Sequence, residues 1–287
     1  MDAIQLGALQ RLEAACIASN GGRLKISWPS LRSRPPGRDN DFLWVAPTSD
    51  PVAAPLEVLG FLGLYQWRPE ELEICGMVHP EHRRLGIASL LYESASAEVA
   101  RRKPGEVLLV VDRIYEGGAA FARSFGGALE HSEHRMEQRR EPSERAGKAP
   151  VTVRDAREED ASFISECLSA AFGDPHVGEF AGVLVIETEK DRVGMMRVER
   201  DGQVASIYGF AVLPAEQGKG YGRSALRTVT SNLRSDGIGT IALEVASTND
   251  SALGLYQSCG FDALGTEDYY AMPVGRGDSG TAVRERL

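Results

Sequence analysis

The chain has 287 residues, 43% of them hydrophobic, a length and composition that suit two domains of a soluble globular protein. Its formal charge is −9, and the residues from 151 onward carry most of it, with 13 lysines and arginines against 21 aspartates and glutamates. Because sequence-independent binding of nucleic acids depends on lysine and arginine at phosphates, this balance excludes a nucleic-acid partner and favours a cationic or amine substrate.

The four cysteines are widely spaced and form no C-x-x-C pair, so the sequence predicts neither a metal site nor a disulfide framework. We expect reduced, buried thiols at Cys16, Cys75, Cys167 and Cys259. Residues 1–5 lack the basic stretch and apolar core of a secretory signal, and no apolar run approaches the roughly 18 residues that would cross a membrane. These features predict a cytoplasmic protein without a membrane partner.

In the first half, apolar periodicity predicts a helix over residues 4–18. Residues 22–40 contain three prolines, which favour an irregular loop. Strands then follow over residues 42–46, 56–67 and 72–78. The last of these strands leads into a loop at residues 83–88, which we call the twin loop.

The second half is predicted to contain the same kinds of element in a similar order. It begins with a strand over residues 151–155 and a helix over residues 157–171. Three strands then form a meander whose last turn is a hairpin at residues 200–202, and they cover residues 183–187, 193–199 and 204–213. A glycine-rich segment at residues 217–223, called here the glycine loop, leads into a helix, a strand over residues 240–245, a helix from Asn249 and a final strand over residues 263–272.

A constant offset of 134 residues relates the two halves. Without an insertion, it aligns residues 83–88 with 217–222, residues 107–111 with 241–245, and residues 124–126 with 258–260. The register holds over about fifty residues, and solenoid repeats have periods of only roughly 20 to 50. The pattern therefore indicates a duplicated domain.

The glycine loop has three glycines within six residues and follows an apolar strand. Glycines leave backbone N–H groups accessible, and the helix start behind them adds partial positive charge, so the segment suits a phosphate group, with Lys219 and Arg223 adding further positive charge. A Walker A loop would end in Gly-Lys-Ser/Thr, and a dinucleotide fingerprint would begin Gly-x-Gly. The spacing Gln-x-x-Gly-x-Gly after Val-x-Pro resembles motif A of the GNAT superfamily of N-acetyltransferases.

Residues 249–261 resemble motif B of the same superfamily, which reads Asn-x-x-Ala-x-x-x-Tyr-x-x-x-Gly-Phe. Asn249, Ala252, Tyr256 and Phe261 stand at its anchor positions. Asn249 can cap the helix that it begins, and Tyr256 lies close to two turns further along the same helix face.

The resemblance implies an α/β fold of two tandem GNAT-like domains, each a mixed twisted β-sheet flanked by α-helices. It implies acetyl-CoA as the donor substrate, with contacts from Phe210, Ala211, Val212, Gln217, Gly218, Lys219, Gly220, Tyr221, Gly222, Arg223, Asn249 and Ala252. It also implies that Tyr256 is the catalytic acid that protonates the departing CoA thiolate, and a reference pKa near 10 keeps a phenol protonated for this role. The acceptor is then a small-molecule or peptide amine.

The acceptor needs a base, because an ammonium with a pKa near 10 must lose a proton before it attacks the thioester. The sequence leaves this base open among His176, Glu179, Glu187, Glu189, Glu199 and Glu244. The strand over residues 208–213 is expected to part from its neighbour, because Gly209 permits a bulge, and to direct a backbone N–H at the acetyl carbonyl.

Only the second half carries both motifs. At the offset of 134, Tyr115 and Ala122 stand in the places of Asn249 and Tyr256, so we expect catalysis in the second half alone. The twin loop still fits motif A, and residual CoA binding there would use Arg83, Arg84, Gly86 and Ala88. The arrangement resembles tandem GNAT proteins, including the mycothiol synthase type.

The predicted order is a degenerate GNAT-like domain at residues 1–140, a linker at 141–150, a catalytic GNAT domain at 151–274 and a flexible tail at 275–287. Two alternatives to acetyl transfer stay open, namely a non-enzymatic acyl-CoA sensor or scaffold and an acyltransferase that uses another acyl-CoA donor. The choice between a monomer and a homodimer is also open.

Overall fold

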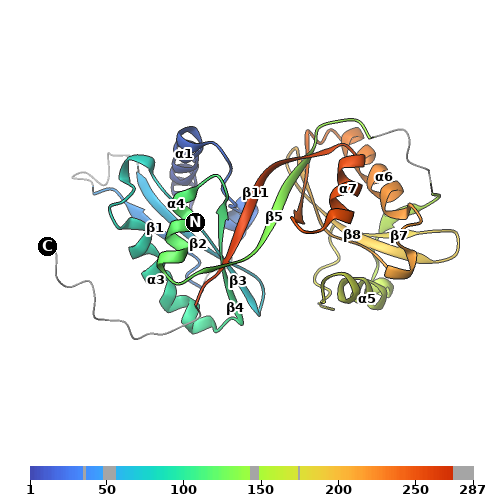
Figure 1. Ribbon diagram of the computed structural model, residues 1–287, viewed down its shortest axis with the longest axis horizontal. Coiled ribbons are helices and arrows are strands. Elements are labelled where there is room, and N and C mark those ends of the chain that lie inside the picture. Colours follow the sequence, from blue (N-terminus) through green and yellow to red (C-terminus); the bar gives the residue numbers. More distant parts are fainter. Residues whose placement is uncertain (35–36, 48–55, 143–148, 174, 274–287) are drawn as a thin grey trace. The chain divides into compact units, whose positions relative to one another are not determined.

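The computed structural model describes residues 1–34, 37–47, 56–142, 149–173 and 175–273 (Figure 1). The chain folds into two compact units. The first unit comprises residues 1–132 and the C-terminal segment from Gly265, and the second unit comprises residues 133–264. The predicted tail and residues 143–148 of the predicted linker lie outside the described residues.

The first unit is an α/β layer structure. Its elements are α1 (Ala3–Asn20), α2 (Trp28–Ser33), β1 (Asp41–Val45), β2 (Val58–Arg68), β3 (Glu71–Val78), α3 (Ile87–Arg102), β4 (Glu106–Asp112), α4 (Glu116–Ser124) and the C-terminal part of β11 (Phe261–Ala271). The sheet order is β1-β2-β3-β4-β11, in which β3 and β4 are parallel. One apolar cluster joins the sheet to α1 and α2, and another joins it to α3 and α4.

The second unit has the same layered organisation. It contains the C-terminal part of β5 (Ala128–Gln138), β6 (Thr152–Asp155), α5 (Ala161–Phe172), β7 (Val183–Glu187), β8 (Arg192–Asp201), β9 (Val204–Val212), α6 (Tyr221–Ser235), β10 (Thr240–Ala246) and α7 (Asp250–Ser258). The sheet order is β5-β10-β9-β8-β7-β6, in which β9 and β10 are parallel. The main apolar cluster lies under α6 and α7, and a second one lies under α5. These helices cover opposite faces of the sheet (Figure 1).

Corresponding elements of the two halves confirm the repeat. The helices α3 and α6, the strands β4 and β10, and the helices α4 and α7 begin 134 residues apart, at Ile87 and Tyr221, Glu106 and Thr240, and Glu116 and Asp250. The predicted α/β class with mixed sheets is therefore confirmed. All four cysteines are buried free thiols, as their positions predict. Among the described residues, no helix has both the length and the apolar content to span a bilayer.

Each half of the sequence supplies its last strand to the other unit. Residues 133–137 of β5 come from the first half and pair with β10 of the second unit. Residues 267–271 of β11 come from the second half and pair with β4 of the first unit. The packing units therefore differ from the sequence domains 1–140 and 151–274, because the repeat marks the duplicated segment while strand pairing decides where that segment packs.

The prediction of an irregular loop over residues 22–40 was wrong for its middle part, where α2 forms. Ser27 caps this helix by accepting a hydrogen bond from the backbone N–H of Ser30 at 3.4 Å. Pro29 is the second residue of α2. A backbone N–H in the first turn of a helix has no intrahelical acceptor, so the missing N–H of proline costs no helical hydrogen bond there. The proline is thus compatible with a helix start.

A buried carboxylate joins the first strand of the second unit to its neighbours. Asp160 is 1% exposed and accepts hydrogen bonds from the side chains of Arg154 and Arg192, at 2.7 to 3.0 Å, and from the backbone N–H of Arg157. These bonds, that of Arg154 foremost, hold the pKa of Asp160 well below its usual range. The network is structural, since it fixes β6 and β8 at the start of α5.

We expect Asp160→Asn to lower the free energy of unfolding by about 3 kcal/mol, because the substitution leaves two guanidinium groups without their buried partner. Urea unfolding at pH 7 measures this loss. The contribution is complete above the unfolded-state pKa of about 4 and declines as the pH falls below it, so the difference between the two proteins shrinks in acid. An equal difference at pH 7 and pH 3 would contradict the assigned role.

Candidate functional site

Two parallel strands of the second unit separate at their C-terminal ends. The pairing of β9 with β10 ends at Ile207 and Leu243. Beyond that point β9 still pairs with β8, and β10 still pairs with β5. No β9–β10 pairing is present between residues 208–212 and residues 244–246, so a gap separates these two strand edges. The predicted parting of the strand over residues 208–213 from its neighbour is thus observed.

A β-bulge turns β9 at this gap. Arg197 pairs with Tyr208 and Met195 pairs with Ala211, so Gly209 and Phe210 together oppose the single residue Met196. Gly209 has φ +54°, a left-handed conformation that glycine adopts without steric strain. A bulge rotates the backbone locally, which allows N–H groups from Phe210 onward to face the gap.

The glycine loop forms an uncapped helix start. Gly218 and Gly220 have φ +76° and +87°, and Gly220 is the N-cap of α6 without a side-chain hydrogen bond. The first-turn N–H groups of a helix have no intrahelical acceptor, so this terminus can bind an anion. Gly222 permits close packing beneath it, because a Cβ there would stand 3.4 Å from both Phe210 and Val212.

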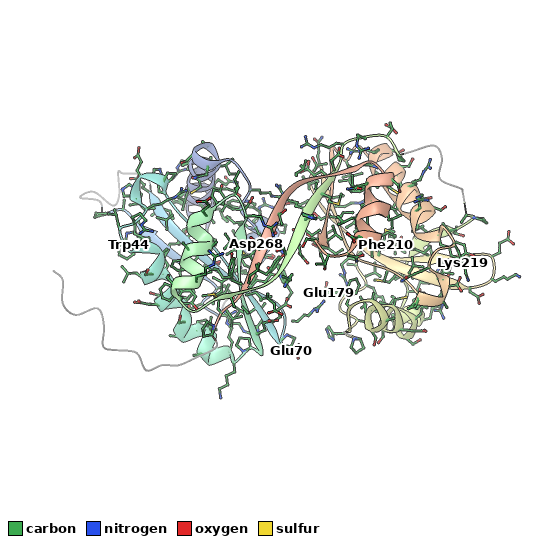
Figure 2. The ribbon with its side chains drawn as sticks, in the orientation of Figure 1. Trp44, Glu70, Glu179, Phe210, Lys219 and Asp268 are labelled. Atoms are coloured by element: carbon green, nitrogen blue, oxygen red, sulfur yellow. The ribbon has the colours of Figure 1, made fainter. Side chains whose placement is uncertain are left out.

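The charged side chains of the glycine loop are engaged within the protein. Lys219, at the edge of the second unit in Figure 2, forms an ion pair with Glu216 at 3.0 Å. The Nε of Arg223 donates to Ser258 Oγ at 3.0 Å, and the Nε2 of Gln217 donates to the carbonyl of Val212 at 3.0 Å. The sequence pattern did not reveal Glu216 and Ser258 as partners. Glu216 thus offsets the charge of Lys219, whereas Arg223 keeps its charge because its partner Ser258 is neutral, and the backbone N–H groups of the loop add to this positive potential.

The helix α7 brings the second motif to the same gap. Asn249 Oδ1 accepts from the backbone N–H of Ala252 at 3.0 Å, which confirms the predicted cap. Tyr256 is 8% exposed and lies in the apolar cluster under α6 and α7, where its ring packs near Phe210 and Phe261 at centroid distances of 6.4 and 6.1 Å. The tyrosine thus packs beside Phe210, the bulge residue that borders the gap and is labelled in Figure 2.

Burial changes the acidity of Tyr256. Loss of solvent, with a smaller contribution from Cys259, raises the pKa of Tyr256 to about 12. The phenol is therefore protonated throughout the physiological range, so it can act as a hydrogen-bond donor or an acid and not as a base. Full proton transfer to a thiolate with a reference pKa of about 8.5 would be uphill by roughly 5 kcal/mol, so a donated hydrogen bond has to precede it.

The six candidate bases occupy different places. Glu187 is bound by Arg154 at 2.6 Å, while Glu189, Glu199, Glu179 and His176 are exposed. Glu244 is half-buried on β10, one residue beyond the last β9–β10 pair. Its neighbours Leu243 and Val245 face the cluster under α6 and α7, so alternation along β10 places Glu244 on the α5 face. By the same alternation Tyr208 lies on that face, and it is 42% exposed.

The twin loop of the first unit has the same backbone form. Gly86 has φ +84°, and Arg84 has φ +65° at the position that Gly218 occupies in the other half. Arg83 Nε donates to the carbonyl of Val78 at 3.1 Å, which repeats the hydrogen bond of Gln217 at the offset of 134. Ala88 follows in the first turn of α3.

The first unit nevertheless lacks the bulge. The pairing of β2 with β3 runs from Gly60–Val78 to Tyr65–Glu73 without a register shift. The side chain of Arg83 also reaches Asn20 at 2.5 Å, so this arginine is engaged by protein groups on two sides. The structure therefore brings the motif residues together with a bulged, open strand edge in the second unit only.

Comparison with known proteins places both halves in one family. A model of the acetyltransferase (GNAT) family matches residues 23–126 and again residues 135–261. The ribosomal protein bS18-alanine N-acetyltransferase of Haemophilus ducreyi is 39% identical over 72 residues, which are 25% of this chain and 50% of that protein. The mycothiol acetyltransferase of Renibacterium salmoninarum is 33% identical over 70 residues, which are 24% of this chain and 21% of that protein. The chain thus matches half or less of the length of these relatives.

Two solved structures resemble nearly the whole chain. A GCN5-related N-acetyltransferase from Sphaerobacter thermophilus aligns with a TM-score of 0.76 and 18% identity, over 94% of this chain and 93% of that one. A tandem GNAT protein from the clavulanic acid biosynthesis pathway aligns with a TM-score of 0.67 and 19% identity, over 96% and 97%. At these identities the likeness establishes the fold.

Proposed function

Because the chain belongs to the GNAT acetyltransferase family, we propose that its second unit transfers an acetyl group from acetyl-CoA to a primary amine by direct attack in a ternary complex. One observation carries the proposal. The gap between β9 and β10 lies between an uncapped helix start, a bulged strand edge and the buried Tyr256.

The residues of the second unit fit acetyl-CoA. The glycine loop and the first turn of α6 would hold the pyrophosphate through backbone N–H groups. The open edge of residues 210–212 and the start of α7 at Asn249 would hold the pantetheine arm. When bound, acetyl-CoA supplies an activated thioester, and the chain has to orient it, polarise its carbonyl and assist departure of the sulfur.

The bulge in β9 is suited to polarising the acetyl carbonyl. An N–H of residues 210–212 that faces the gap would donate to the acetyl oxygen, whose negative charge increases as the amine attacks. Backbone N–H groups keep their orientation throughout the reaction, so this stabilisation needs no reorganisation. Tyr256 would donate a hydrogen bond to the sulfur from the face covered by α7, opposite the α5 face.

The acceptor would approach from the α5 face, where Glu244 and Tyr208 stand at the mouth of the gap. We assign Glu244 as the base that accepts the ammonium proton, directly or through one water molecule. In the strand register, Arg135 of β5 stands directly opposite Glu244 of β10, so the two side chains lie on the same face of the sheet. Glu244 differs from the other five candidates in that strand register puts it one residue beyond the last β9–β10 pair, whereas Glu187 lies in an ion pair and the remaining four are exposed.

Glu244→Gln tests the base. We expect kcat/KM at pH 7.5 to fall about 100-fold, the lower range for loss of a general base. The residual rate should rise about tenfold per pH unit until the pKa of the amine near 10, because only acceptor molecules that are already deprotonated react. The matched control Glu199→Gln changes an exposed carboxylate on β8 and should leave the rate unchanged. A wild-type pH profile in the Glu244 variant would contradict the assignment.

The activity itself is tested on a panel of primary amines, including peptides with free N-termini, with detection of released thiol. Turnover on at least one amine is the expected result. Acetyl-CoA binding without turnover across the panel would favour an acyl-CoA sensor instead. Parallel binding measurements with acetyl, succinyl and longer thioesters would reveal another acyl donor.

A further inference from the structure

The residues that connect α1 with α2 are held across the strand ends of the first unit. At one end, Asn20 accepts from Arg83 of the twin loop at 2.5 Å. Tyr115, the residue that stands where the second half has Asn249, donates its hydroxyl hydrogen bond to the carbonyl of Gly21. The backbone N–H of Arg23 then donates to Asp112 Oδ2 at 3.0 Å. Residues 20–25, called here the strap, thus contact the segments that follow both β3 and β4.

The strap fits closely against the end of β4. Gly22 has φ +72°, and a Cβ at this residue would lie 2.8 Å from Asp112 Oδ2 and 2.9 Å from Ile114 Cγ2. A side chain is therefore excluded both by the backbone conformation and by the space. The strap is a built part of the first unit and not a loosely placed connection.

The strap ends in an ammonium group between two buried carboxylates. Lys25 Nζ donates to Tyr269 Oη, and it lies 3.7 Å from Glu73 Oε2 and 3.9 Å from Glu267 Oε2. The side chains of Glu73 and Glu267 are 11% and 5% exposed, whereas that of Lys25 is 25% exposed. The ammonium also lies 4.7 Å from the centroid of the Tyr269 ring. Carboxylates this deeply buried require a cation nearby.

Lys25 and its partners lie at the place in the first unit that corresponds, through the repeat, to the acceptor position proposed for the second unit. The pairing of β3 with β4 ends at Ile74 and Leu109, and Glu73 directly precedes that point. Val110, one residue beyond the last pair, lies at the offset of 134 from Glu244 and belongs to the same apolar cluster as Tyr269. The ammonium of Lys25 therefore lies at the parting of β3 and β4, on the face covered by α1 and α2, which corresponds to the α5 face of the second unit.

We propose that Glu73, Glu267 and Tyr269 form a binding subsite for a primary alkylammonium ion in the first unit, and that Lys25 occupies it as an internal ligand. The strap is then held at both ends, by Arg83 at Asn20 and by the subsite at Lys25. The comparison with an acceptor position rests on the function proposed for the second unit. The subsite itself rests on the contacts of Lys25 alone, and its test uses no acetyl-CoA.

The test is chemical rescue of Lys25→Ala. The substitution removes the propylammonium part of the lysine side chain, so added propylammonium chloride should bind in the vacated space and restore the lost stability. We expect a lowered Tm that rises saturably with propylammonium by about 3 to 6 °C, with no such rise for tetramethylammonium chloride or propan-1-ol at equal concentration. Lys25→Met should be destabilised but not rescued, since its side chain fills the space. Lys190→Ala, an exposed lysine in the second unit, should show neither effect.

Equal responses of the Lys25→Ala and Lys25→Met variants to propylammonium, or no response of either, would overturn the proposal. If Lys25→Ala does not fold, the unmutated protein gives the answer. Limited acylation of lysines with an activated ester, followed by mass spectrometry, should modify Lys25 at least about tenfold more slowly than Lys190, because the Lys25 ammonium is bound by Tyr269 and lies beside Glu73 and Glu267, whereas Lys190 is exposed. Equal rates at the two lysines would overturn the proposal as well.

Discussion

Gly220→Glu is expected to abolish acetyl-CoA binding by the whole chain. The new carboxylate would stand at the start of α6, where it would occupy the N–H groups meant for the pyrophosphate and repel its charge. Repulsion between unit charges 4 Å apart amounts to about 4 kcal/mol at an effective dielectric constant of 20, which is roughly a thousandfold in Kd. Titration calorimetry should therefore give one site per chain for the wild type and no measurable site for the variant.

Gly86→Glu is the matched control, because the repeat provides the same backbone position in the twin loop. Both glycines are N-caps with left-handed φ values of +84° and +87°, so each substitution causes a similar strain of about 1 kcal/mol. We expect Gly86→Glu to keep one site with unchanged Kd, because Arg83 of the twin loop is already engaged by Val78 and by Asn20 of the strap. A second site that disappears in this variant would show that both units bind CoA.

Tyr256→Phe is expected to lower kcat by about 100- to 10,000-fold while the Kd of acetyl-CoA stays within about twofold. The substitution removes one hydroxyl from a side chain that is 8% exposed and keeps the ring that packs near Phe210 and Phe261. Because burial raises the pKa of Tyr256 to about 12, the wild-type rate should show no loss from tyrosine ionisation below about pH 11. Steady-state kinetics on an identified amine acceptor measures both quantities.

Tyr270→Phe provides the control for loss of a buried phenol. Tyr270 is 2% exposed in the first unit, and its hydroxyl accepts from Arg123 at 3.4 Å. Turnover should be unchanged in this variant. An unaltered kcat in Tyr256→Phe would remove the tyrosine from the mechanism and leave hydrogen bonding by the backbone as the support for the departing sulfur.

Motifs made of adjacent residues could be predicted from the sequence. The cap of α7 by Asn249 and the succession of strand, glycine loop and helix over β9 and α6 follow from residues a few positions apart. The failure at α2 was also local, since three prolines suggested a loop where the cap at Ser27 permits a helix. Local signals were sufficient where the backbone conformation alone was in question.

Side-chain partners could not be predicted in the same way. The sequence predicted added positive charge from Lys219 and Arg223, but it did not reveal Glu216 and Ser258 as their partners. It left five glutamates and one histidine as candidates for the base, and only strand register shows that Glu244 stands beside the gap. Lys25 and Tyr269, which meet in the first unit, are 244 residues apart in the chain.

The sequence by itself determined the family, the duplication, the glycine loop and the helix that carries Tyr256. The tertiary structure alone decided that the last strand of each half packs in the other unit, that β9 is bulged while β3 is not, and that the strap is bonded to Arg83, Asp112 and Tyr115. The physical reason is the range of the interactions. Helix caps and turns depend on neighbouring residues, whereas strand pairing and buried ion pairs depend on segments that only the folded chain brings together.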